Sequence, residues 1–423
     1  MKKNKTQLDI VLRLGCFDAV FWCIMASFGS YVVPMALQRG YTQSVVGIMV
    51  SGYLVSAFAG QFFWASICDQ LRATKKVFLL GVSLTIATQL LLYFTRSALL
   101  FGLLYICLGF TLQPMGSILD AWMLKALKGS MKTYAPARGG GSIGYAVAML
   151  VMGKLVARFG YGIMPVCSTA VAIAVLAIAY VIPDAVFSEN PSESPLRERV
   201  SWKTTLSILK NKSYLLVLAV VFLLGMEIAP VNTFKISILE ALGGDVSTQG
   251  MDGFFSCVAQ FAVFEAGALL MRIPAPGRLL SGAVLTSVSI FITMNASNCE
   301  TVIAATLLVG VTYGLVTPAG RERILETIDP RFQTTAIGLM DGCYSFFGGT
   351  VAMLYAGSLA EAFGLRAMLL TCFSVSLAPL ALLVVFQAAA RRNALQHRNV
   401  RCCTHTCCGE NIPGRINVKE QEE

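Results

Sequence analysis

The chain contains few charged residues. Asp, Glu, Lys and Arg make up 13% of its 423 residues, against roughly a quarter in soluble domains. Apolar residues make up 56% of the chain. Apolar runs of about 20 residues recur along the whole length, and each is long enough to cross a bilayer as a helix. This composition leaves little chain for a soluble domain and predicts a membrane protein with many spans.

Histidine and nucleotide-binding motifs are also scarce. Both histidines, His397 and His405, lie in the C-terminal tail, so a histidine cannot relay a proton inside the membrane. The pattern G-x-x-x-x-G-K-[ST] does not occur, which excludes ATP binding by a P-loop. The tail carries RCCTHTCCGE, but adjacent cysteine pairs fit the usual spacing of metal ligands poorly. We therefore expect no enzyme activity, no cofactor and no metal site.

We predict an all-α polytopic fold with twelve membrane-spanning helices. The predicted spans are 11–34, 43–66, 77–95, 98–124, 136–158, 161–183, 213–240, 247–271, 278–297, 300–322, 333–360 and 365–389. Lys2, Lys3 and Lys5 precede a first apolar stretch of full spanning length. This arrangement favours a retained membrane anchor over a cleaved signal peptide.

Two segments of the chain resemble each other. VAMLVMGKLVARFG at 147–160 and VAMLYAGSLAEAFG at 351–364 share eight of fourteen residues at an offset of 204 residues, and Gly144 and Gly348 match at the same offset. A fixed period of about half the chain indicates two parallel halves with a substrate site between them, which is a transporter architecture. The predicted parts are a six-helix half at 1–183, a cytoplasmic linker at 184–212, a second six-helix half at 213–390, and a cytoplasmic tail at 391–423 that we expect to be disordered.

Basic residues are unevenly distributed over this topology. With the N-terminus in the cytoplasm, all but six of the 33 basic residues lie on the inner side or at inner helix ends. The six exceptions are Arg39, Arg96, Lys154, Arg158, Lys235 and Arg366. This positive-inside pattern predicts a multi-pass protein of the plasma (inner) membrane with both termini in the cytoplasm. The net charge of +10 then reflects topology and anionic lipid, with no nucleic-acid partner.

The order of six spans, a cytoplasmic loop and six further spans resembles the major facilitator superfamily. After the second span, that superfamily usually carries a loop of the Gly–x3–Asp–x2–Gly–Arg type. This chain has ASICDQLRATKK there, in which Asp69 is kept and Ala65 replaces the glycine. The resemblance implies a conformational gate at Asp69 and Arg72. A carboxylate at this helix end would pair with cations and with a neighbouring helix N-terminus when the inner side is closed.

Within that superfamily, the chain is most similar to the lactose-permease-type and nucleoside–proton symporters. The resemblance rests on FGSYVVPMALQRGYTQSVVG, LDAWMLKAL, YAPARGGGSIGYA, NTFKISILEALGG, FAVFEAGALL and YGLVTPAG. Asp120 is followed by Arg138 eighteen residues later and by Tyr145 seven residues after that. The lactose permease has Glu, Arg and Trp at this spacing, where they hold the sugar. The resemblance therefore implies that Asp120, Arg138 and Tyr145 bind the substrate.

The same three residues suit a polar solute on chemical grounds. A carboxylate and a guanidinium on adjoining antiparallel helices can pair and still keep acceptors and donors for hydroxyl groups. An aromatic face can cover the apolar face of a sugar or a base. The alternative is an ion pair between helices with no ligand role. The run GGGSIG after Arg138 lacks the context of a phosphate loop, and we expect it to let two helices approach closely.

Carboxylates inside the spans are the candidates for carrying a proton, because burial disfavours their charged form. They are Asp18, Asp120, Glu227, Glu265 and Asp341. We rank Glu265 first, then Asp341, then Glu227. Glu265 is expected roughly 10 Å inside the inner end of the eighth span. Asp341 lies near the repeat equivalent of Arg138, so these two side chains are expected to face one another across the halves. For each carboxylate, a salt bridge without a coupling role is the alternative.

Two of these carboxylates have expected structural partners. Glu227 lies in the middle of the seventh span, and we expect Lys235 or a water-lined wall beside it. Asp18 lies near Arg13 at an inner helix end, which favours a structural pair between them.

Together these features predict a monomeric secondary transporter that works by alternating access. The expected substrate is a small polar solute, namely a sugar, an oligosaccharide or a nucleoside, moved by proton symport. One alternative is an efflux antiporter for amphipathic compounds, although the fifth span lacks the Gly-Pro-rich antiporter pattern. Another is a non-transporting membrane sensor with the same fold, for which the unusual tail is the only sequence feature.

Overall fold

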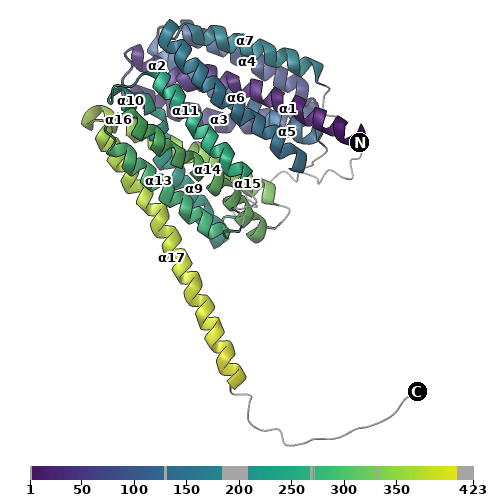
Figure 1. The fold of residues 1–423 in the computed structure, drawn as a ribbon, viewed down its shortest axis with the longest axis vertical. Coiled ribbons are helices and arrows are strands. Elements are labelled where there is room, and N and C mark those ends of the chain that lie inside the picture. Colours follow the sequence, from purple (N-terminus) through teal and green to yellow (C-terminus); the bar gives the residue numbers. More distant parts are fainter. Residues whose placement is uncertain are drawn as a thin grey trace, which may run out of the picture.

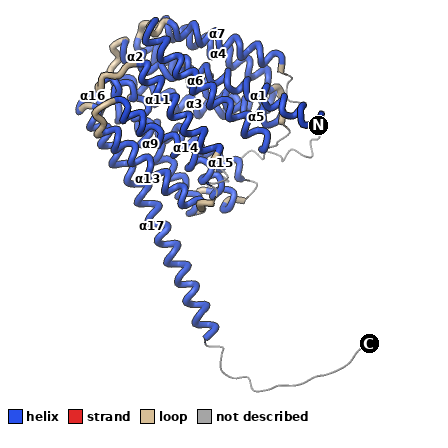
Figure 2. Tube along the Cα trace, viewed as in Figure 1, coloured by secondary structure: helices blue, strands red, loops and turns tan. Residues whose placement is uncertain are grey.

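The computed structural model describes residues 2–127, 131–182, 208–266, 270, 272–329 and 332–406. Within these ranges the regular structure is helical and contains no strand (Figure 2). Most of the predicted linker, residues 184–207, lies outside the described residues, as do residue 183 and residues 407–423 of the tail. The predicted all-α fold is confirmed.

The first half contains seven α-helices and one 3₁₀ turn in its described residues. They are α1 (Lys2–Ser27), η1 (Gly29–Tyr31), α2 (Val32–Gln38), α3 (Gln43–Leu71), α4 (Thr74–Phe94), α5 (Ala98–Ala126), α6 (Met131–Phe159) and α7 (Ile163–Val181). The described elements of the second half are α9 (Lys212–Thr233), α10 (Lys235–Glu240), α11 (Val246–Glu265), α13 (Ala275–Met294), α14 (Cys299–Thr327), α15 (Gln333–Gly342), η3 (Cys343–Phe347), α16 (Gly348–Phe363) and α17 (Leu365–Thr406). Figure 1 shows α1–α7 gathered into one group and α9–α16 into another.

Eleven helical segments of the described residues are long and apolar enough to cross a membrane, and they coincide with eleven of the predicted spans. The remaining predicted span, 247–271, coincides with α11. Helix α11 packs between α6 and α14, and it carries Gln249, Asp252 and Gln260 among its apolar residues. All twelve predicted spans are therefore helices, and one of them places several polar side chains inside the bundle.

Local sequence signals set the helix boundaries. The side chains of Thr42 and Asn298 accept a backbone N–H from the first turns of α3 and α14. Asp245 forms a capping box with Thr248 at the start of α11. These side chains bond to N–H groups that have no partner within the helix. Gly364, with φ of 82°, allows the turn between α16 and α17.

The internal repeat appears as two equivalent helix pairs. Helix α1 packs closely on α6, and helix α9 packs closely on α16. A Cβ atom at Gly144 would lie under 3.0 Å from the Ala19 carbonyl oxygen, and one at Gly348 would lie under 3.0 Å from the Phe222 carbonyl oxygen. Side chains are therefore excluded at both positions, and the expectation that the glycines allow close helix approach is confirmed.

The second copy of the repeat contains a π-helix that the first copy lacks. Residues Cys343–Phe347 form η3 between α15 and α16, whereas α6 is α-helical throughout. Ser142 and Ser345 are 203 residues apart, whereas Gly144 and Gly348 are 204 apart. A π-turn accommodates one inserted residue, and such turns are frequent at functional sites. Ser142 and Ser345 both line the cavity, and taking them as equivalents puts a one-residue insertion within η3.

A cluster of aromatic rings fixes the helices of the first half against each other. Phe17, Phe78 and Trp122 come from α1, α4 and α5, and their ring centroids are 5.6 to 5.8 Å apart. All three side chains are fully buried. Because Phe17 precedes Asp18 and Trp122 lies two residues after Asp120, this contact fixes the positions of both carboxylates.

Helix α17 continues as a helix to Thr406, well beyond the bundle (Figure 1). The expectation of a disordered tail from residue 391 is therefore wrong as far as Thr406.

Candidate functional site

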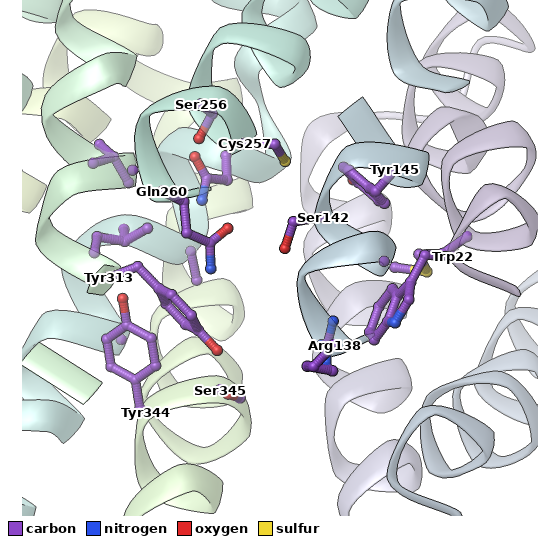
Figure 3. Close-up of a pocket in the computed structure, with 18 residues that line it drawn as sticks. Trp22, Arg138, Ser142, Tyr145, Ser256, Cys257, Gln260, Tyr313, Tyr344 and Ser345 are labelled. Carbon is purple, nitrogen blue, oxygen red and sulfur yellow. The ribbon is translucent and has the colours of Figure 1, made fainter. Parts of the chain in front are cut away.

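A cavity of about 430 Å³ lies between the two halves. Helices α1 and α6 line it from the first half, and α9, α11, α14 and η3 line it from the second (Figure 3). Its polar and aromatic lining includes Trp22, Arg138, Ser142, Tyr145, Asn232, Ser256, Gln260, Tyr313, Tyr344 and Ser345. The volume falls within the range of pockets that hold small molecules.

Arg138 is the charged centre of the wall formed by the first half. Its Nε lies 3.0 Å from Asp120 Oδ1 on α5, and its Nη1 donates to Asp18 Oδ2 on α1 at 3.4 Å. The guanidinium also lies over the Trp22 ring, 4.9 Å from its centroid. The predicted pair of Asp120 and Arg138 is thus present, and a second carboxylate joins it. We call Asp18, Asp120 and Arg138 the Arg138 cluster.

The position of Asp18 differs from the prediction. Arg13 pairs with Asp9 at 2.9 Å, one helical turn away, so the expected pair of Asp18 with Arg13 is wrong. Residues four apart face each other on a helix, whereas residues five apart do not. Asp18 instead accepts the Gly141 N–H at 3.0 Å, and within the described residues its Oδ1 has no hydrogen-bond partner.

Tyr145 lies one helical turn beyond Ser142 on the cavity-facing side of α6. Its hydroxyl and the Ser30 hydroxyl are 2.8 Å apart. This contact holds the ring against the cavity, where its face is available to an apolar surface of a solute. Arg138 and Tyr145 therefore line one cavity wall. Asp120 lies behind that wall and pairs with Arg138.

The opposite wall combines amides, hydroxyls and aromatic rings. Gln260 and Tyr313 point toward the cavity from α11 and α14, and Tyr344 lies beside Tyr313 (Figure 3). The two tyrosine ring centroids are 5.8 Å apart. Asn232 adds a second amide from α9. Amides both donate and accept hydrogen bonds, so this wall can bind a flat polar group or several hydroxyl groups.

Two of the three predicted proton carriers have surroundings that the structure describes. Glu265 is the last residue of α11 and its side chain is exposed. Its expected depth of roughly 10 Å inside the span stays a prediction. Asp341 pairs with Arg321 of its own half at 3.0 Å and is partly exposed. Arg138 pairs with Asp18 and Asp120, so no ion pair joins it to Asp341 among the described residues, and the expected facing of these two side chains stays a prediction.

Glu227 is fully buried, and among the described residues neither of its carboxyl oxygens has a hydrogen-bond partner. The expected partner Lys235 instead donates to Thr306 Oγ1 at 2.8 Å and lies 3.8 Å from Asp252 Oδ1. Eight residues along a helix correspond to roughly 12 Å, and a break at Phe234 also separates Glu227 from Lys235. An ionised carboxylate in such an environment is strongly disfavoured.

The predicted gate residues lie at the end of α3. Asp69 and Arg72 are both exposed there, and Arg72 adopts a left-handed backbone conformation with φ of 47°. Neither residue is among the described residues that line the cavity.

The halves are in close contact at the end where α3 begins and α16 ends. A Cβ atom at Gly357 would lie under 3.0 Å from the Gln43 carbonyl oxygen. The Ser44 N–H donates to Glu361 Oε2 at 2.9 Å across the same contact. We call the contact between α3 and α16 the outer seal, after the predicted orientation, which puts this end on the outer side. The halves meet at a second contact, between α6 and α11. A Cβ atom at Gly153 would lie under 3.0 Å from the Gly250 Cα atom.

Several residues of the cavity were not among the predicted site residues. Trp22 lines the cavity four residues after Asp18 on α1, and the cavity residues Ser256 and Gln260 are also four residues apart on α11. Polar residues that recur at helical spacing within an apolar span lie on one face and indicate a polar environment. This spacing was the available signal, but it does not reveal which neighbouring helix that face meets.

Comparisons with known proteins agree with this architecture. The family model described as "MFS_1 like family" matches residues 12–389. The maltose permease of Geobacillus stearothermophilus is 22% identical over 363 residues, which cover 85% of this chain and 90% of the permease.

Solved structures share the fold at low sequence identity. A crystal structure of a mutant of the nucleoside transporter NupG superposes with a TM-score of 0.78 at 14% identity, covering 89% of this chain and 99% of that one. A second NupG structure gives a TM-score of 0.74 at 14% identity, covering 90% and 98% of the two chains. A bacterial homologue of the human lysosomal transporter Spinster, described as inward-facing and unoccupied, gives 0.65 at 11% identity, covering 90% and 95%.

Proposed function

The chain belongs to the MFS_1 like family, and from this premise we propose that it takes up a sugar, an oligosaccharide or a nucleoside by proton symport. It is a multi-pass membrane protein and a secondary transporter of the major facilitator superfamily, not an enzyme. The observation that carries the proposal is the cavity between the halves, in which a charged centre faces a wall of amides and tyrosines.

The chemistry of the lining supports a neutral, hydroxyl-rich solute. Arg138 supplies several N–H donors in a fixed plane, and Asp120 beside it supplies acceptors. Trp22, Tyr145 and Tyr313 offer aromatic faces, and these can cover the apolar face of a sugar or a base. The similar proteins include a maltose permease and a nucleoside transporter, whose names agree with these two solute classes.

Proton coupling is the second part of the proposal. A proton carrier must change charge during the cycle, and Glu265, Asp341 and Glu227 remain the candidates from the sequence. The burial of Glu227 and the absence of a partner among described residues suit a carboxyl that is neutral in this conformation. Replacing the carrier by the corresponding amide should preserve solute exchange at equal concentrations and abolish accumulation, because an amide cannot titrate.

The closed outer seal supports alternating access. In this conformation α3 meets α16 at the outer end, whereas Asp120 and Asp341 near the inner end remain partly exposed. If the outer end opened and the inner end closed, the cavity would face the other side of the membrane. Alternation between the two conformations would carry a solute across. We assign Asp69 and Arg72 to the gate that holds the inner side closed in the opposite conformation.

Binding in a thermal-shift experiment tests the solute class. The purified protein would be screened against maltose, sucrose, uridine and adenosine, with the Arg138→Lys variant as the comparison. We expect stabilisation of the wild type by members of one class and a much smaller effect on the variant, since a ligand that binds only the folded protein raises its stability. Stabilisation by amphipathic cations alone would favour the efflux alternative. The absence of stabilisation by all of these compounds would contradict the proposed solute classes.

A further inference from the structure

The Arg138 cluster contains two carboxylates that differ in access to water. The Asp120 side chain is 34% exposed, whereas the Asp18 side chain is 1% exposed. When both are ionised, two negative charges share one guanidinium. Water can stabilise Asp120 if the guanidinium moves away, whereas Asp18 is almost fully buried as long as Arg138 stays in place. The ionised form of Asp18 therefore depends on Arg138.

The surroundings of Asp18 offer no substitute for Arg138. Helix α6 contributes Arg138 and Tyr134, and Tyr134 lies in hydrogen-bonding contact with Asp120 of α5. Helix α7 also packs against α1, and its sequence from Ile163 to Val181 contains no acidic or basic residue. Within the described residues, Arg138 is the one cation in contact with Asp18.

The backbone at Gly141 brings the parts of this arrangement together. A Cβ atom there would lie under 3.0 Å from Asp18 Oδ2, from Trp22 Cδ1 and from Arg138 Nη1. The missing side chain lets the carboxylate, the indole and the guanidinium meet at one point. Because Arg138 and Trp22 also line the cavity, a change in the cavity acts directly on the partner of Asp18.

We propose that Asp18 binds the proton that is co-transported with the solute, and that competition for Arg138 couples the two. This inference rests on the proposed function as a proton symporter. A polar group of the solute accepts hydrogen bonds from the Arg138 guanidinium and draws it away from Asp18. One proton from water on the open side then bonds to an Asp18 carboxylate oxygen, and no other covalent bond forms or breaks. When the solute leaves, Arg138 returns to Asp18 and the proton is released to the side that is then open.

Coupling of this kind is reciprocal, so its sign can be stated. Solute binding favours protonation of Asp18, and protonation favours solute binding by the same factor. Solute affinity of the wild type should therefore fall as pH rises. An asparagine at position 18 has the shape of the protonated form and can still accept the Gly141 N–H. It should bind the solute with an affinity that does not depend on pH.

The first test compares Asp18→Asn with Asp9→Asn, a matched replacement in the exposed pair on the same helix. Uridine and maltose serve as probes for binding across a pH series, for exchange in proteoliposomes, and for accumulation driven by a proton gradient. We expect Asp18→Asn to bind and exchange the probe without accumulation, and Asp9→Asn to behave like the wild type. Failure of Asp18→Asn to bind, or accumulation by it, would overturn the assignment.

The same experiment separates this inference from the proposed function. A wild type that transports the probe without proton uptake and without pH dependence would refute symport itself. Coupling that is lost in Glu227→Gln and kept in Asp18→Asn would preserve symport and move the proton to Glu227.

A second measurement does not require a known solute. In Arg138→Gln, Asp18 has lost its cation and should be protonated at neutral pH. Infrared spectroscopy should then show a protonated-carboxyl band that is absent from the double variant Asp18→Asn/Arg138→Gln. The absence of this band from Arg138→Gln would overturn the proposal.

Discussion

Replacing Arg138 by lysine should weaken solute binding far more than it weakens the fold. Lysine keeps the charge but loses the planar fork and most of the contact with the Trp22 ring, which now lies 4.9 Å from the guanidinium. Loss of a hydrogen bond between this charged group and the solute costs about 1.5–3 kcal/mol, which corresponds to a roughly 10- to 150-fold increase in Kd. Loss of the cation–π contact with Trp22, about 0.5–1 kcal/mol, lowers the stability of the fold and not the affinity for the solute.

The assay is equilibrium binding of radiolabelled uridine and maltose to purified protein, with melting temperature measured in parallel. Arg39→Lys is the matched control. Arg39 donates to the carbonyl oxygens of Tyr93 and Thr95 and stacks on aromatic rings, but it is not among the described residues of the cavity. We expect the control to lower the melting temperature without changing Kd. An Arg138→Lys variant with wild-type affinity would refute the ligand role and favour the structural ion pair.

Three further predictions concern topology, the outer seal and a buried ion pair. Single cysteines introduced at Ser192 and at Asn417 in a cysteine-free background should resist membrane-impermeant reagents in intact cells, and labelling of either would contradict the cytoplasmic assignment. Gly357→Ala should loosen the contact of α16 with the α3 backbone. It should therefore increase labelling of Cys257, a cysteine of the cavity, from the outside; unchanged labelling would contradict the seal. Lys235→Met should leave its buried aspartate partner unpaired and cost about 3–5 kcal/mol of stability. An unchanged melting temperature would show that this pair contributes little.

The spans and the repeat could be predicted because they depend on properties that the sequence displays directly. An apolar run of spanning length has few alternatives to a transmembrane helix. The matched positions Gly144 and Gly348 helped to reveal the repeat, and the structure places each of them at a close contact between two helices. The pair of Asp120 and Arg138 was also predicted, because it joins neighbouring spans at a spacing known from a resembling family.

The partner of Asp18 could not be predicted from the residues around it. Asp18 and Arg138 are 120 residues apart, and their contact depends on how α1 is rotated and shifted against α6. A local rule did apply to Arg13, which lies four residues from Asp9 and five from Asp18. Strict use of this spacing rule would have left Asp18 without a cation on its own helix. It would therefore have indicated a cation from a distant part of the chain.

The second-half wall of the cavity was missed for a related reason. Gln260, Tyr313 and Asn232 lie on three different helices, and single polar residues in separate apolar spans show no pattern until those helices are packed together. The π-helix at Cys343–Phe347 was likewise hidden, because a one-residue insertion leaves the apolar character of a span unchanged.

Uptake into proteoliposomes under an imposed proton gradient tests the central claim most directly. Purified protein would be reconstituted with an acidic exterior, and internal uridine and maltose would be measured over time with and without a protonophore. We expect one probe to accumulate above its external concentration, and we expect the protonophore to abolish this accumulation. Extrusion of the probes, or uptake of neither at any gradient, would contradict the proposal that this transporter imports a small polar solute with protons.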